Sequence, residues 1–219
     1  MRLFTSFDAN TRIASAILLS LLCALILAIS FSQAGAPELA FNESAIDNPA
    51  TKTDYPWQLE LTDSNGQSVK LSEYRGRTLL LSFFYATCGY ACPIQTARLA
   101  QVQKSLKPET LAASRFVSVS IHPKRDTPNV IDAFKRPYGI NEAHWQFGAP
   151  SDSANLNKLL LKAGVSTEAV DGTTQTDHTM KILLIDPTGK VMQRYVGDKF
   201  SIKRVAKEIE TLVRLSSLS

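Results

Sequence analysis

An apolar run that leads into two cysteines is the feature that most constrains this chain. Residues Thr78–Tyr85 have the length and residue types of a buried strand, and Cys88 and Cys92 follow with three residues between them. Pro93 comes next, and the first turn of a helix tolerates proline. The pattern predicts an α/β domain whose first core strand ends at a thiol pair.

Two thiols at this spacing can close a disulfide or bind a soft metal ion as thiolates. His178 stands ninety positions after Cys88, just before a second apolar run, Ile182–Ile185. If the fold brings His178 back to Cys88 and Cys92, two sulfurs and one imidazole suit Cu(I), and Cu(II) with a further weak ligand. A structural disulfide is the alternative, although so short a loop would constrain the unfolded chain little.

The N-terminal residues 1–34 predict export. Arg2 and Arg12 precede an uncharged segment, residues 13–31, whose length is close to the roughly 20 residues that span a bilayer. Because the basic flank comes first, the rest of the chain is expected outside, so the prediction is a bacterial inner-membrane anchor with a periplasmic domain. Small residues at both selective positions, Ser32 and Ala34, leave a cleaved signal peptide, and hence a soluble periplasmic protein, as the alternative.

Two further regions follow the N-terminal segment. Residues 35–56 are polar, contain prolines and lack periodicity, as a linker does. Residues 57–216 have the length of one ordinary domain. The net charge of +4 is spread along the chain without a basic run. This composition argues against nucleic acid as a partner and weakly favours an anionic membrane surface or an acidic protein.

Periodicity and turn residues give the order of elements within residues 57–216. The expected strands are 59–62 and 69–71 (a hairpin), 78–85, 116–121, 182–185 and 191–196, and the expected helices are 92–106, one that begins at Asp126-Thr127-Pro128, 153–161 and 202–213. This order predicts a thioredoxin-like fold with an N-terminal hairpin and a helical insertion.

Seven segments together carry a family resemblance. They are Leu61–Gly66, Leu71–Gly76, Cys88–Pro93, Ser120–Thr127, Trp145–Gly148 and Asp177–Thr179 with the following Leu184–Gly189. In this order and at these separations they resemble the Sco/SenC copper-chaperone family, from about Leu59 to Phe200.

The resemblance implies a membrane-tethered metallochaperone rather than an enzyme. Such a protein would bind one copper ion through Cys88, Cys92 and His178, receive it from an upstream donor, and deliver it to the copper-bearing subunit of cytochrome c oxidase, at the binuclear centre. The alternative is an exported thiol–disulfide oxidoreductase that uses a redox disulfide between Cys88 and Cys92. A peroxidase or a copper or redox sensor is a third class.

Four further residues qualify this interpretation. Gly89 and Tyr90 stand where the family has proline and often an acidic residue, and His122 replaces a family aspartate. His122 is either an auxiliary ligand or a surface-loop histidine. Asp177 would orient a ligand by hydrogen bonding to it, as carboxylates beside metal ligands do. The alternative is a solvated or capping residue, because neighbouring side chains on an extended chain point oppositely.

Overall fold

The computed structural model describes residues 57, 59–169 and 176–218. The expected membrane segment 13–31 and the linker 35–56 lie outside the described residues, so neither they nor the domain boundaries are tested. Among the described residues, no helix combines the length and the apolar character that a membrane crossing requires.

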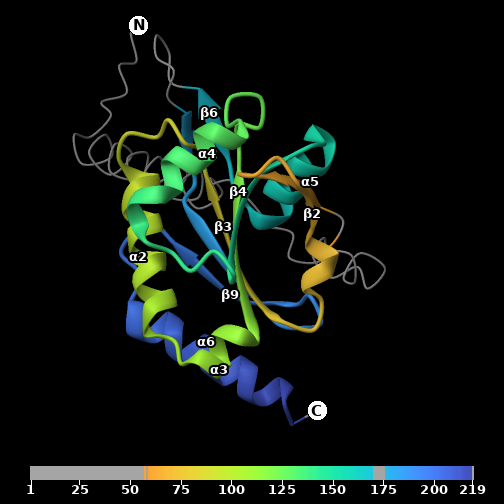
Figure 1. Ribbon diagram of the computed structural model, residues 1–219, viewed down its shortest axis with the longest axis vertical. Coiled ribbons are helices and arrows are strands. Elements are labelled where there is room, and N and C mark those ends of the chain that lie inside the picture. The colour runs from red at the N-terminus through yellow and green to blue at the C-terminus, as the bar shows by residue number, and fades with distance from the viewer. Residues whose placement is uncertain (1–56, 58, 170–175, 219) are drawn as a thin grey trace, which may run out of the picture. The chain divides into compact units, whose positions relative to one another are not determined.

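The described residues form a mixed α/β fold around one main sheet (Figure 1). The strands are β1 Glu60–Asp63, β2 Ser68–Lys70, β3 Thr78–Phe84, β4 Ser114–Ser120, β5 Trp145–Pro150, β6 Thr167–Ala169, β7 Thr176–His178, β8 Lys181–Ile185 and β9 Val191–Val196. The helices are η3 Leu71–Tyr74, α2 Ala91–Ser105, α3 Pro108–Ala112, α4 Pro128–Lys135, η4 Arg136–Tyr138, α5 Ser153–Ala163 and α6 Ile202–Ser216.

The main sheet has seven strands in the order β2-β1-β5-β4-β3-β8-β9, and β6 and β7 form a separate antiparallel pair. Strands β3, β4 and β5 are parallel, and β8 runs antiparallel to β3. The carboxyl ends of β3 and β4 and the beginning of β8 therefore lie at one edge of the sheet. The element order is consistent with the thioredoxin-like arrangement expected from the sequence.

Helices cover both faces of this sheet. Two successive right-handed crossovers, through α2 and α4, place both helices on one face, where α2 also packs against α6. Figure 1 shows α5 on the other side. Strand β3 is buried along its whole length, as a central strand covered on both faces should be. Under α4, stacked and perpendicular rings build an aromatic core from Phe84, Phe134 and Phe147.

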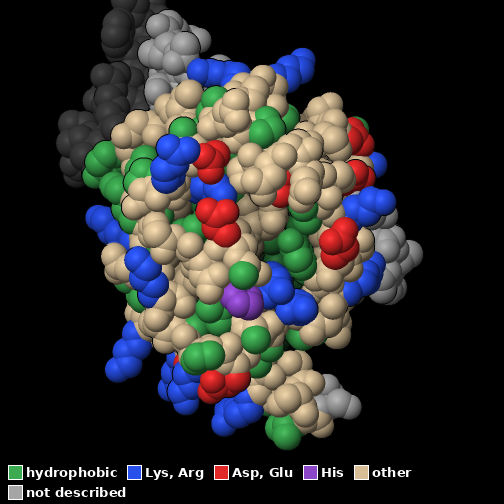
Figure 2. Space-filling model, viewed as in Figure 1, with side chains coloured by type: hydrophobic (Ala, Val, Ile, Leu, Met, Phe, Trp, Pro, Cys, Tyr) green, Lys and Arg blue, Asp and Glu red, His purple; other side chains and the backbone are tan. Residues whose placement is uncertain are grey.

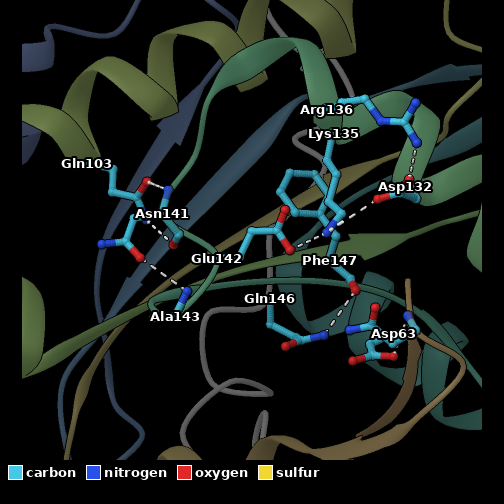
Figure 3. Close-up of polar contacts among 11 residues, drawn as sticks. Asp63, Gln103, Asp132, Lys135, Arg136, Asn141, Glu142, Ala143, Gln146 and Phe147 are labelled. Atoms are coloured by element: carbon cyan, nitrogen blue, oxygen red, sulfur yellow. Dashed lines mark hydrogen bonds and ion pairs between the residues drawn. The ribbon is translucent and has the colours of Figure 1, made fainter.

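Polar side chains hold the crossover between α4 and β5 in place (Figure 3). The amide of Gln103, in α2, accepts from the backbone N–H of Asn141 at 2.8 Å and donates to its carbonyl at 3.1 Å. Lys135 is buried and its Nζ lies 2.5 Å from Glu142 and 3.7 Å from Asp132. These contacts satisfy the buried polar groups of the crossover and fix the point at which β5 enters the sheet.

Charged side chains are interspersed over the surface. On the face in Figure 2, lysines and arginines alternate with acidic residues. This pattern agrees with a net charge of +4 that is spread along the sequence.

Most expected elements are confirmed with small shifts at their ends. The sequence interpretation assigned no strand to residues 145–150, which form β5 next to β4. The sequence interpretation also missed α3 and the β6–β7 pair. The helix predicted from Asp126-Thr127-Pro128 begins at Pro128, with Thr127 as its N-cap residue but without a side-chain bond. The Asp126 carboxylate instead accepts from the backbone N–H of Ala86.

Candidate metal centre

Both cysteines lie where β3 gives way to α2. The chain leaves β3 at Phe84 and turns, with the N–H of Cys88 donating to the carbonyl of Tyr85 at 3.1 Å. Helix α2 then begins at Ala91, so Cys92 lies in its first turn. Cys88 and Cys92 are both free thiols in this structure. The predicted redox disulfide between them therefore remains a prediction.

The sulfur of Cys88 lies among hydrogen-bond donors. The backbone N–H of Cys92 points at it, with nitrogen and sulfur 3.3 Å apart. The Cys92 thiol, the backbone N–H of Tyr90 and the Tyr85 hydroxyl also donate to it. These bonds, chiefly the one from the Cys92 thiol, lower the pKa of Cys88 to about 4 despite partial burial. The first turn of a helix adds a favourable dipole. Cys88 is therefore the thiolate of the pair.

Cys92 is buried, and its thiol stays protonated. Its side chain is 0% exposed and packs within the hydrophobic core. Donation to the Cys88 sulfur and burial both raise the pKa of Cys92 above the ordinary value for a thiol. A partly exposed thiolate thus lies beside a buried, protonated thiol, and the two sulfurs differ in accessibility and in charge.

The structure brings His178 to this pair. His178 ends β7, and β7 leads through Thr179 and Met180 into β8. Because β8 pairs antiparallel with β3, its beginning lies at the cysteine edge of the sheet. The Nε2 of His178 lies 3.5 Å from the Sγ of Cys92. A contact between the side chains of residues 92 and 178 thus results from sheet pairing.

The three side chains supply a donor set that suits a soft ion, since thiolates and imidazole favour Cu(I). Among the described residues, no group of three or more His, Cys, Asp or Glu side chains already has the geometry to hold a metal ion. Binding by Cys88, Cys92 and His178 together therefore requires side-chain rotation and loss of the proton from Cys92.

The sequence interpretation missed the contacts of Asp126, which lies at the same edge of the sheet as the two cysteines. Its carboxylate is 1% exposed and accepts from the backbone N–H of Ala86 at 3.2 Å and from the Ser120 hydroxyl at 2.5 Å. Burial raises the pKa of Asp126, and the bond from Ser120 opposes that shift. The carboxylate ties the loop after β4 to the loop that carries Cys88. A signal was present, because Asp126 follows a strand that ends at the same edge.

The sequence interpretation singled out two further residues near the candidate ligands, His122 and Asp177. The ring of His122 stacks on Tyr85, with centroids 4.9 Å apart, and burial lowers its pKa. Asp177 lies in β7 opposite Glu168. Its side chain is outside the described part of the chain, so the hydrogen bond by which it would orient a ligand remains a prediction. Tyr90, between the cysteines, is 74% exposed and is available for contact with another molecule.

Comparison with known proteins shows which family the sequence resembles. A family model described as SCO1/SenC matches residues 47–214. The SCO1 protein homolog of Bacillus subtilis is 28% identical over 136 residues, which cover 62% of this chain and 70% of that protein.

Solved structures share the fold. A SCO1/SenC family lipoprotein from Bacillus anthracis superposes with a TM-score of 0.64 at 24% identity, covering 71% of this chain and 95% of that one. Bradyrhizobium japonicum ScoI, solved with copper bound, gives 0.58 at 23% identity, covering 70% and 96%.

The unequal environments of the two sulfurs predict selective alkylation. In the reduced chain, iodoacetamide should label Cys88 well before Cys92, because Cys88 is more exposed and ionised. With a pKa of about 4, Cys88 should react at nearly the same rate from about pH 6 to 8, whereas an ordinary thiol gains about tenfold per pH unit. Mass spectrometry of quenched samples gives both rates.

The Cys92→Ala variant is the control for the cause of the low pKa. Without the Cys92 thiol as donor, the pKa of Cys88 should rise and its alkylation should become dependent on pH. Equal labelling of both cysteines in the unsubstituted chain would contradict the assigned asymmetry.

Proposed function

Because the chain belongs to the SCO1/SenC family, we propose that it is a copper metallochaperone for cytochrome c oxidase. Cys88, Cys92 and His178 bind one copper ion, and the protein passes it to the copper-bearing subunit of the oxidase. The Sco family is one of cytochrome c oxidase assembly proteins, and solved relatives contain copper. An upstream donor supplies the ion.

The contact between Cys92 and His178 is the observation that carries this proposal. Their Sγ and Nε2 atoms are 3.5 Å apart, although the residues are 86 positions apart in sequence. Thiol exchange alone needs no imidazole at this position. A soft metal ion does gain from it, because imidazole adds a neutral nitrogen ligand to two thiolates.

The same geometry supports release as well as binding. Cys88 is partly exposed, and the exposed Tyr90 lies in the loop between the cysteines. An acceptor can reach a copper ion at Cys88 and replace its ligands one at a time. Cu(I) is the preferred cargo of thiolates, and Cu(II) would need a further weak ligand. Oxidation of the pair to a disulfide removes both sulfurs, so redox state gates loading.

A thiol–disulfide oxidoreductase is the second candidate. The specific observation in its favour is the thiolate of Cys88 beside the buried thiol of Cys92, since such a pair can attack a disulfide and then resolve the mixed disulfide. The substrates would be disulfides between cysteines of the oxidase or of other envelope proteins, which would be reduced while Cys88 and Cys92 become oxidised to a disulfide. His178 would then contribute little.

We also propose that residues 13–31 anchor the chain in the bacterial inner membrane and that the copper-binding domain faces the periplasm. The support is the basic residues that precede this apolar segment. A solved relative, from Bacillus anthracis, is described as a lipoprotein.

Copper titration tests the ligand set. The reduced chain should bind one Cu(I) in competition with a chelator, and Cys88→Ser or Cys92→Ser should abolish tight binding. His178→Ala should weaken binding by more than about tenfold, because loss of even an outer-shell partner of a metal ligand costs 10–100-fold. His144→Ala is the matched control, since His144 bonds to Arg115 at the opposite edge of the sheet. Tight binding that survives loss of both cysteines would refute the site.

Complementation separates the two functions. In a strain that lacks the gene, oxidase activity under copper limitation should be restored by the unsubstituted chain but not by Cys88→Ser or His178→Ala, and excess copper should rescue both variants. Full restoration by His178→Ala, with failure of Cys88→Ser, would favour the oxidoreductase. The readout is oxidase activity of isolated membranes.

The membrane anchor has its own test. After cell fractionation, the protein should remain with the inner membrane and should retain residues 1–34, because the apolar segment is long enough to stay in the bilayer. N-terminal sequencing or intact mass gives the answer. A periplasmic protein that begins at Gly35 would replace the anchor with a cleaved signal peptide.

A further inference from the structure

One aromatic side chain contacts two of the candidate copper ligands. Tyr85 directly follows β3 and is 3% exposed. Its hydroxyl donates to the sulfur of Cys88. Its ring meets the ring of His178 nearly at right angles, with a centroid distance of 5.8 Å and an interplanar angle of 72°. Tyr85 is therefore placed to influence both Cys88 and His178.

A second ring holds Tyr85 from another side. His122 stacks on it, with centroids 4.9 Å apart and planes at 30°. One face of the Tyr85 ring is thus covered by His122, and the ring of His178 lies nearly perpendicular to the ring of Tyr85. Through this stack, His122 reaches the candidate site by way of Tyr85.

Hydrogen bonds link both residues of this stack to the carboxylate of Asp126. The backbone N–H of His122 donates to the Ser120 hydroxyl at 3.0 Å, and that hydroxyl donates to Asp126. Asp126 in turn accepts from the N–H of Ala86, the residue next to Tyr85. Both members of the stack are therefore tied, through one buried carboxylate, to the same edge of the sheet.

We propose that Tyr85, backed by His122, is a positioning residue that orients the Cys88 sulfur and the His178 imidazole toward a shared copper ion. This inference rests on the proposed function and adds a role for two residues outside the ligand set. His122 acts through Tyr85 and does not ligate the metal.

The physical reason lies in the rotation that binding requires. Cys88 and His178 must turn toward a common point, and each has freedom about its side-chain bonds. A hydrogen bond to the sulfur and a ring against the imidazole restrict that freedom before the metal arrives. Residues that restrain metal ligands in this way typically change affinity 10–100-fold when replaced.

The test uses the reduced full chain, with Cu(II) alone for spectra and Cu(I) with a competing chelator for affinity. Tyr85→Leu should shift the sulfur-to-copper absorption band and the electron paramagnetic resonance spectrum, and should weaken Cu(I) binding about 10–100-fold. Tyr85→Phe keeps the ring and loses the bond to Cys88, so it should give a smaller shift.

Two substitutions of His122 separate stacking from ligation. His122→Phe keeps a flat ring without nitrogen and should retain the spectrum and affinity of the unsubstituted chain. His122→Ala removes the ring and should shift the spectrum in the direction of Tyr85→Leu. If His122→Phe and His122→Ala disturb the spectrum equally, His122 is a ligand and the proposal is wrong.

A control distinguishes positioning from loss of stability. Phe134→Leu removes a ring that stacks on Phe84 in the same core at 5.1 Å, and it should leave the copper spectrum unchanged in a folded chain. An unchanged spectrum in Tyr85→Leu would overturn the proposal and leave the proposed function intact. If the unsubstituted chain fails to bind Cu(I) in competition with the chelator, the proposed function and this proposal both fall.

Discussion

The antiparallel pairing of β3 with β8 is the constraint on which the candidate site depends. Ser82 pairs with Ile182, so the chain that enters β8 lies at the end of β3 where α2 begins. Strand β3 is buried on both faces, and a slip of one residue would turn its side chains to the opposite faces. The core thereby fixes the register, and the register brings His178 to the sulfur of Cys92.

The beginning of α2 makes the two sulfurs unequal. Cys88 lies outside the helix and accepts hydrogen bonds from its first turn, whereas Cys92 lies inside that turn and faces the core. Unpaired backbone N–H groups at a helix start favour negative charge, and burial disfavours it. An accessible thiolate beside a buried thiol suits both metal exchange and thiol exchange. The nearby imidazole is the feature that favours the metal.

A buried carboxylate joins the two loops at this edge. Burial of a charge is costly unless hydrogen bonds compensate, and Asp126 receives them from Ser120 and from the backbone of Ala86. The loops after β3 and β4 are consequently held together below the aromatic stack of His122 and Tyr85. This arrangement restrains the surroundings of Cys88, while Tyr90 at the outer rim remains exposed.

Local patterns in the sequence determined the individual elements. Apolar runs gave β3 and β8, helical periodicity gave α6, and the cysteine pair marked the junction of β3 with α2, because each signal lies within a few neighbouring residues. The tertiary structure alone decided that Trp145–Pro150 joins the sheet, that Asp126 binds the backbone of Ala86, and that Tyr85 touches both His122 and His178. Each of these contacts joins segments that are far apart in the sequence. Which segments become neighbours is decided by the packing of the core, and no local pattern of residues encodes that.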